Sequence, residues 1–254
     1  MFNIVAKILS NFSKRKRLII FTITACLLVL AIFSHTEPIP QELVYHHLSD
    51  QRLWLTVPNF ANIISNLPFA TLGLSGLILC FRNKEIGISW YIFFSGLFLV
   101  AFGSSYYHVQ PNNQRLIWDR LPMTICFMSL FSALCAENIS LRYEKIILPI
   151  VIFLGLSSVI YWHFTDDLRF YALIQFGALL SIPLILSFYK SQYSHRHYLL
   201  YGLLFYVLAK IFELNDNFIF ELTAHLLSGH TIKHLLAAAA TYCVYLMLKK
   251  RRRY

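Results

Sequence analysis

Residues 146–164, IILPIVIFLGLSSVIYWHF, form an apolar run without a single acidic residue, lysine or arginine. A helix of about 20 such residues crosses the hydrocarbon core of a bilayer, which is about 30 Å thick. The next run, RFYALIQFGALLSIPLILSFY at residues 169–189, carries only its first arginine as a charged side chain. These two stretches therefore predict a pair of consecutive membrane-spanning helices.

Similar runs extend outward from this pair toward both ends of the 254-residue chain, which is 57% hydrophobic and only 13% charged. We expect an all-α membrane protein, a seven-transmembrane-helix bundle with one additional N-terminal transmembrane helix. The expected core spans are 60–81, 87–108, 117–137, 146–164, 169–189, 197–214 and 230–248, and the additional span is 18–34. Residues 14–17, KRKR, before an apolar run also resemble a signal peptide, but without a clear cleavage site we favour a retained anchor.

The formal net charge of +10 raises the question of nucleic-acid binding, which the position of the basic residues answers. With the N-terminus inside, sixteen lysines and arginines fall in inner segments and four in outer segments: Arg52, Arg115, Arg120 and Arg169. An excess of lysine and arginine is typical of cytoplasmic loops. We therefore expect both termini in the cytoplasm, the basic tail near anionic headgroups, and no nucleic-acid partner.

Polar side chains cluster at one side of the expected bundle. His108 ends an outward-going helix, Asp119 begins the next inward-going helix, and His230 begins the last one. All three residues therefore lie at the outer end of the bundle, although more than a hundred residues separate His108 from His230. Polar groups inside spans are costly and often mark function.

Spacing strengthens the prediction of a metal site. His230 and His234 are four residues apart on one helix, so both imidazoles can hold one ion, and Ser104 and His108 share this spacing on another helix. Three histidines with an open fourth position are typical of catalytic zinc.

Structural roles remain open for each of these polar residues taken singly. Ser104 can hydrogen-bond a backbone carbonyl one turn back, and Asp119 beside Arg120 can act as a helix-dipole partner. Asn62, Ser65 and Asn66 can serve as hydrogen bonds between helices.

Three segments make the sequence resemble the alkaline ceramidase family, part of a superfamily of seven-helix membrane hydrolases that includes adiponectin receptor type proteins. They are GSSYYHVQPNNQRLIWDRLPM at 103–123, HTIKHLLAAAATYC at 230–243 and NFANIISN at 59–66. The stretch LSDQRLWLTVPNFANIISN at 48–66 and the segment SGHTIKH at 228–234 look most like the bacterial branch.

The resemblance implies a catalytic domain over residues 50–248. It is preceded by residues 1–49, with the basic cytoplasmic N-terminus, the extra helix and an outer loop, and followed by the basic tail 249–254.

The resemblance further implies a Zn²⁺ ion held by His108, His230 and His234, with Asp119 as the general acid and base and Ser104 beside it. Eukaryotic members bind Ca²⁺ through an acidic cluster. Here Asn59 stands where a glutamate would be and only Asp50 offers a carboxylate, so a calcium site is doubtful.

The implied activity is zinc-dependent hydrolysis of the N-acyl amide bond of a ceramide-like lipid taken from the bilayer, at a site facing the outer side. Lys210, Glu213 and Asp216 suggest either headgroup contacts or a helix-terminal ion-pair network. The alternatives are an esterase or phospholipase-like hydrolase with the same zinc chemistry, a non-catalytic lipid or metal receptor, and a transporter. We infer no obligate protein partner.

Overall fold

The computed structural model of the chain describes residues 31–254, and the predicted N-terminal span lies outside the described residues except for its last few positions. The described elements are short η1 (Leu43–His46), α3 (Phe60–Ile64), α4 (Leu67–Arg82), α5 (Ile88–Val109), α6 (Asn113–Asn138), short η2 (Leu141–Tyr143), α7 (Glu144–Thr165), α8 (Arg169–Phe188), α9 (Tyr198–Leu214), α10 (Asp216–Leu222) and α11 (Gly229–Lys250).

The expected all-α membrane fold is confirmed for the described residues. Six helices are long and apolar enough to cross a bilayer, and the pair α9 and α10, bent by 84°, makes up to seven. The first core span, Phe60–Arg82, consists of α3 and α4 with a break at Ser65 and Asn66. Each predicted core span thus coincides with an observed helix or helix pair.

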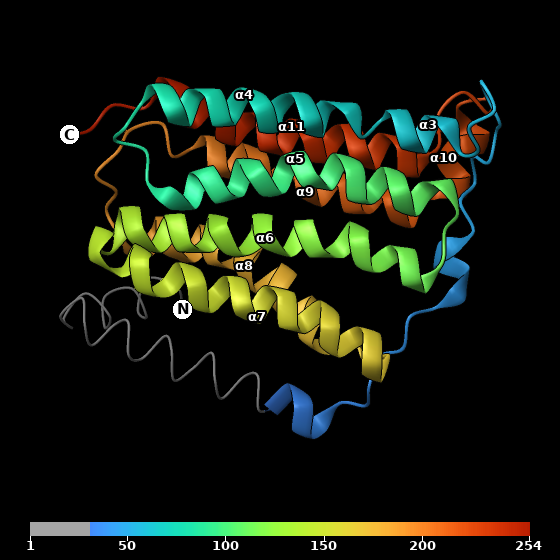
Figure 1. Cartoon of the computed structure of the whole chain (residues 1–254), viewed down its shortest axis with the longest axis horizontal. Helices are drawn as coiled ribbons and strands as arrows, with labels where there is room; N and C mark the ends of the chain where they lie inside the picture. The colour runs from blue at the N-terminus through green and yellow to red at the C-terminus, as the bar shows by residue number, and fades with distance from the viewer. Residues whose placement is uncertain (1–30) are drawn as a thin grey trace.

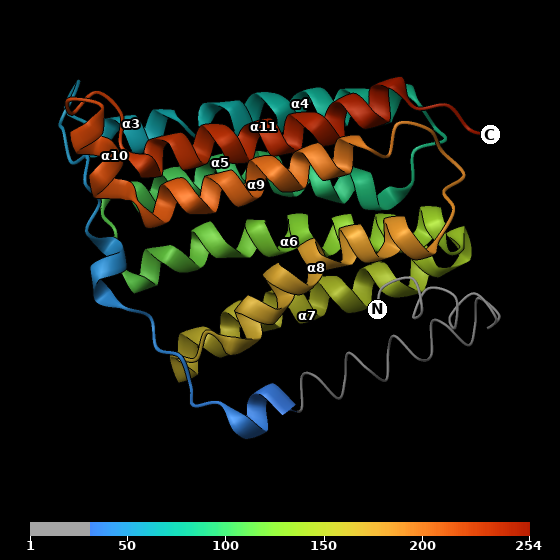
Figure 2. The ribbon, with the colours of Figure 1, turned by 180° about the vertical axis from the view of Figure 1, so that it is seen from behind.

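The helices run side by side along the long axis of the molecule (Figure 1). Helix α11 packs against α9 and α4, and α5 packs between α4 and α6. Helices α7 and α8 cover the other side of α6, as the reverse view also shows (Figure 2). As a result α6 is the most enclosed of the candidate spans.

Side-chain caps fix where two helices begin. Asn112 accepts a hydrogen bond from the backbone N–H of Arg115 at 2.9 Å, so α6 begins at Asn113 rather than at residue 117 as expected. Ser228 accepts from the backbone N–H of Thr231 at 3.0 Å, so α11 begins at Gly229. These caps set the depth of the polar residues that follow them.

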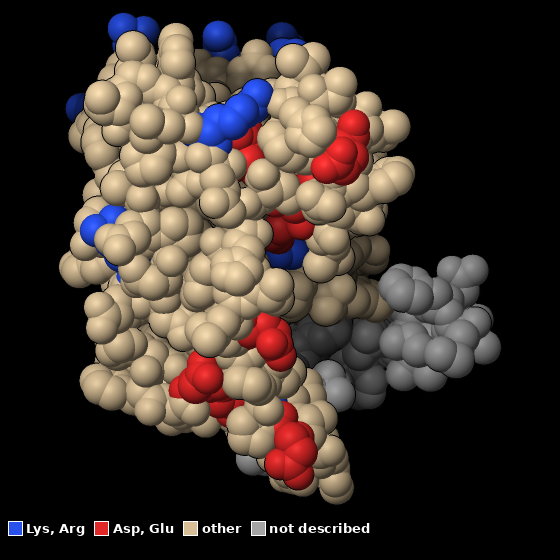
Figure 3. All heavy atoms as spheres, turned by 90° about the vertical axis from the view of Figure 1, so that its right-hand side faces the viewer, with Lys and Arg blue, Asp and Glu red and all other residues tan. Residues whose placement is uncertain are grey.

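The two ends of the bundle differ in charge. The end face with α3 and α10 displays acidic side chains and few basic ones (Figure 3). Exposed acidic residues at this end include Asp166, which follows α7, and Glu221 of α10. The basic C-terminal residues after α11 lie at the opposite end (Figure 1). Charge therefore separates along the axis of the helices.

Glycines allow α5 to approach both of its neighbours closely. A Cβ atom added at Gly73 of α4 would lie 2.6 Å from the backbone nitrogen of Phe98 in α5. One added at Gly103 of α5 would lie 2.1 Å from the carbonyl oxygen of Trp118 in α6. Neither backbone neighbour can rotate away as a side chain would, so these positions require glycine.

We expect Gly73→Ala to lower the melting temperature of the detergent-solubilised protein, because α4 and α5 must separate to admit the methyl group. Overpacking of this kind costs about 1–3 kcal/mol. Gly177→Ala in α8 is the matched control, since nothing lies within 4 Å of an added Cβ there. Equal melting temperatures for the two variants would contradict the close packing of α4 on α5.

Candidate metal centre and lipid cavity

The last helix presents two histidines at its first turns. Asp216, at the start of α10, accepts a hydrogen bond from the backbone N–H of His230 at 2.7 Å and another from that of Ser49 at 2.9 Å. Asp216 therefore ties α11 to the loop before α3. Its hydrogen bonds thus go to backbone N–H groups, whereas Lys210 and Glu213, the residues with which the sequence grouped it, pair with each other.

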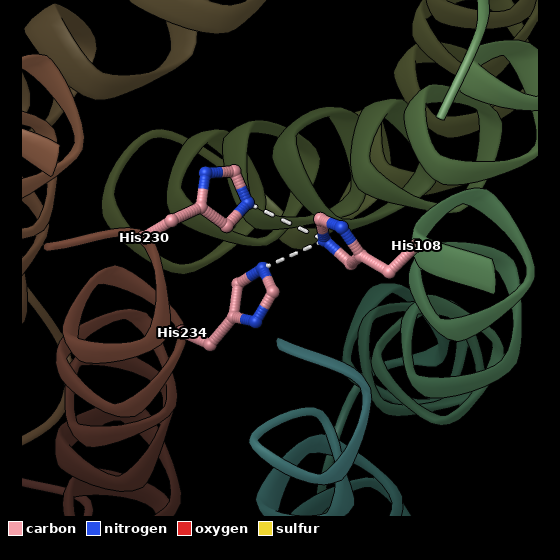
Figure 4. Close-up of side chains that lie close together, drawn as sticks. All are labelled: His108, His230 and His234. Carbon is pink, nitrogen blue, oxygen red and sulfur yellow. Dashed lines mark hydrogen bonds between the residues drawn. The ribbon is translucent and has the colours of Figure 1, made fainter. Parts of the chain in front are cut away.

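Three buried imidazoles meet between α5 and α11. The Nε2 atom of His108 lies 3.3 Å from the Nε2 atoms of both His230 and His234, and all three rings point toward one another (Figure 4). Within residues 31–254, these three histidines form the one cluster of histidine, cysteine or acidic side chains that could hold a metal ion. Tetrahedral zinc with bonds of about 2.0–2.1 Å to nitrogen places two ligand nitrogens about 3.3 Å apart. The observed spacing fits such an ion.

Residues outside the cluster hold one of these rings and the backbone of another histidine. The Ser65 hydroxyl lies 2.8 Å from Nδ1 of His234, which leaves Nε2 of that ring facing the other two histidines. The side-chain amide of Asn59 donates to the backbone carbonyl of His108 at 2.8 Å. A hydrogen bond to the outer ring nitrogen, such as that of Ser65, fixes the tautomer and orientation of a metal-binding histidine.

Asn62 and Asn66 act one step further from the rings. The side-chain oxygen of Asn62 accepts from the Thr231 hydroxyl at 2.9 Å, which joins α3 to α11. The side-chain amide of Asn66 donates to the backbone carbonyl of Asn62 at 2.8 Å. Of the three polar residues singled out in this segment, Ser65 is the one with a hydrogen bond to a histidine of the cluster.

A cavity of about 230 Å³ opens beside the histidine cluster. Ser104, Asp119 and His234 line its polar end, and the Ser104 hydroxyl interacts with the Asp119 carboxylate. Apolar residues line the rest, including Phe93, Leu97, Phe127, Leu130, Leu203 and Val244. From Asp119 to Leu130 the lining follows α6 for about 16 Å. The cavity is therefore polar at the cluster and apolar along its length.

Lys210 and Glu213 lie on this cavity wall and form an ion pair. Glu213 also accepts from Lys233 at 3.0 Å, and the hydroxyl of Tyr45 donates to it at 3.2 Å. The Lys233 ammonium lies a further 3.0 Å from Nε2 of His230, a nitrogen that would also bind the metal. The ion-pair network that the sequence left open is therefore present, and it borders the histidine cluster.

Arg120 also lines the cavity, although the sequence predicted no role for it in the site. It is only 6% exposed, and its guanidinium lies over the rings of Trp162 at 4.0 Å and Tyr171 at 4.8 Å. One signal could have found it. Residue 120 falls inside the predicted span 117–137, and a charged side chain inside a span is itself a functional indication.

Asp50 and Asn59, the positions considered for calcium, are engaged in contacts with the protein. Arg52 donates to the Asp50 carboxylate through Nε at 2.8 Å and Nη2 at 2.6 Å. Burial raises the pKa of Asp50, but the hydrogen bonds from Arg52 together lower it by more. The pKa of this carboxyl therefore lies below its usual value. The guanidinium of Arg52 thus supplies the positive charge beside this carboxylate.

Comparison with known proteins connects this arrangement to a family. The family model described as Ceramidase matches residues 50–253, the part of the chain that holds the three histidines, Ser104 and Asp119. A search of curated proteins gave no match. The match covers well over half of the chain and confirms the resemblance inferred from the three segments. The chain belongs to the ceramidase family, and it is a membrane hydrolase of the class that acts on the amide bond of ceramide.

Proposed function

We propose that this protein is a zinc-dependent amidohydrolase that cleaves the N-acyl amide bond of a ceramide-like lipid into a fatty acid and an amine. The observation that carries the proposal is the position of the His108 Nε2 atom, 3.3 Å from the Nε2 atoms of both His230 and His234. This cluster lies beside Asp119 and Ser104 at the polar end of an apolar cavity. The family membership supports the reaction class.

The ligand set favours zinc over a harder cation. His108, His230 and His234 offer three neutral nitrogens and no carboxylate, and they come from two helices with a side still open toward the cavity. Imidazole ligands suit zinc, whereas magnesium and calcium prefer oxygen. A zinc ion bound there would polarise the amide carbonyl and make water reactive near neutral pH.

Asp119 moves the proton in this proposal. Its carboxylate lines the cavity near His234 and is a suitable base for the proton of the attacking water. The same group then delivers that proton to the amine nitrogen as the carbon–nitrogen bond breaks. This delivery is needed because an amine leaves readily only when it is protonated. One carboxylate can therefore both remove the proton from water and protonate the leaving amine. Ser104 beside it can donate a hydrogen bond to the oxygen of the former carbonyl.

The cavity suits a lipid that approaches from the bilayer. An acyl chain can lie along the apolar lining while the amide reaches the polar end. We also propose that this end faces the outer side of the membrane and that both termini are cytoplasmic. The acidic end face (Figure 3) and the basic residues at the opposite end support this orientation.

We expect purified wild-type protein to bind one zinc ion, and His234→Ala to lose it. Ser65→Ala should weaken zinc binding about 10- to 100-fold, because His234 then loses the hydroxyl that holds its ring. Competition with a chelator of known affinity measures both effects. Ser75→Ala, an exposed serine on α4, is the matched control. Undiminished zinc affinity in His234→Ala would rule out this ligand set.

We expect Asp119→Asn to keep its zinc and to lose about 10²- to 10⁴-fold in the rate of fatty-acid release from ceramide. The amide side chain has nearly the same shape but cannot accept and return a proton. Glu221→Gln, an exposed carboxylate on α10, should retain wild-type turnover. Full activity of Asp119→Asn would show that another group moves the proton. A wild-type protein that releases fatty acid only from ester lipids would contradict the proposed amide specificity.

A further inference from the structure

The polar end of the cavity carries more positive than negative charge. Its lysine, arginine, aspartate and glutamate lining residues are Asp119, Arg120, Lys210, Glu213 and Lys233. Three cations thus face two carboxylates, and any metal ion on the neutral histidines would increase the excess. Uncompensated charge inside a membrane protein is costly, and such groups usually pair with a counter-charge. The lining of the cavity does not supply that counter-charge.

Glu213, one of the two carboxylates at this end, is fully engaged by partners within the protein. One oxygen of Glu213 accepts from both Lys233 and Tyr45, and the other accepts from Lys210. Asp119 interacts with Ser104. Few acceptors therefore remain for a ligand, and the groups left to recognise one are donors.

Arg120 supplies a buried donor that has no acceptor among the described residues. Its Nη2 donates to the side-chain oxygen of Gln41, but its buried Nη1 has no hydrogen-bond partner among the described residues. The rings of Trp162 and Tyr171 hold the guanidinium plane, so it cannot turn freely toward another acceptor. A buried charged donor without a partner is costly and calls for an acceptor from outside the chain.

The lysines add further donors. Lys210 uses one of its three N–H groups on Glu213. The N–H that Lys233 directs at Nε2 of His230 would lose its acceptor when a metal ion takes that nitrogen. Metal binding would therefore leave this end of the cavity with still more free donors. A hydroxyl could satisfy some of them but would not offset their charge.

We propose that the lipid cleaved at this site carries an anionic group, a carboxylate or a phosphate, on the amine side of the scissile amide, and that Arg120 with Lys210 binds it. The proposal rests on the proposed amidohydrolase function. Arg120 directly follows Asp119, which must reach the amine nitrogen, whereas the acyl chain runs the other way along the apolar lining. The guanidinium fork matches the oxygens of carboxylate and phosphate groups.

Two matched substrate pairs test this proposal on the zinc-loaded protein. N-oleoylglycine and N-oleoylethanolamine differ in a carboxylate against a hydroxyl, and ceramide 1-phosphate and ceramide differ in a phosphate. The readout is the ratio of kcat/KM for the anionic lipid to that for its neutral partner. We expect a wild-type ratio of about 10 or more in at least one pair, and that pair identifies the anion.

Arg120→Gln should lower this ratio about 10- to 100-fold, and Arg120→Lys should lower it less because the charge remains. Arg115→Gln removes a cation from the same helix that does not line the cavity, and it should keep the wild-type ratio. If Arg120→Gln fails to fold, Lys210→Gln carries the same test. Ratios near one in both pairs for the wild type, or ratios unaffected by these substitutions, would overturn the proposal while leaving the amidohydrolase function standing.

Binding separates failure of this proposal from failure of the amidohydrolase function. We expect the anionic lipid of the responsive pair to raise the melting temperature of the zinc-loaded protein more than its neutral partner does, and Arg120→Gln to abolish the difference. If no amide is cleaved but this difference appears, the amidohydrolase function is wrong and the anion site is supported. An equal shift for anionic and neutral lipids would overturn the anion site.

Discussion

The site depends on the contact between the last turn of α5 and the first turns of α11. His108 comes from the first helix and His230 and His234 from the second, so the cluster exists only if these helix ends share one depth. Ser228 fixes where α11 begins, and Asp216 anchors the same turn to the loop before α3. A shift of one turn, about 5.4 Å, would separate the rings.

The surrounding helices form the cavity beside this contact. Close packing of α5 on α4 and α6 brings Ser104 and Asp119 to the wall that His234 also lines. Apolar residues then continue inward, so a lipid chain can remain in an apolar environment while its polar part meets the metal ligands. Glu213 sits at the boundary and holds two lysines there, which makes the polar end rich in hydrogen-bond donors.

Hydropathy and residue spacing predicted the helical spans and the convergence of His108, Asp119 and His230 at one end. This works because alternating spans fix depth without any knowledge of side-chain contacts. The contact of Lys233 with Glu213 depends instead on how α9 and α11 are rotated against each other. Arg120 was placed near a helix start because the cap at Asn112 was missed, whereas it lies two turns inside α6. Hydropathy carries no information on the rotation of one helix against another or on side-chain caps.

Zinc K-edge X-ray absorption of the purified wild-type protein tests the central claim most directly, because it reports which atoms surround the metal. We expect imidazole nitrogen scattering from three histidines and one further oxygen or nitrogen ligand, all at about 2.0–2.1 Å. Sulfur scattering at about 2.3 Å, or a shell made of oxygen alone, would contradict a metal centre built from His108, His230 and His234.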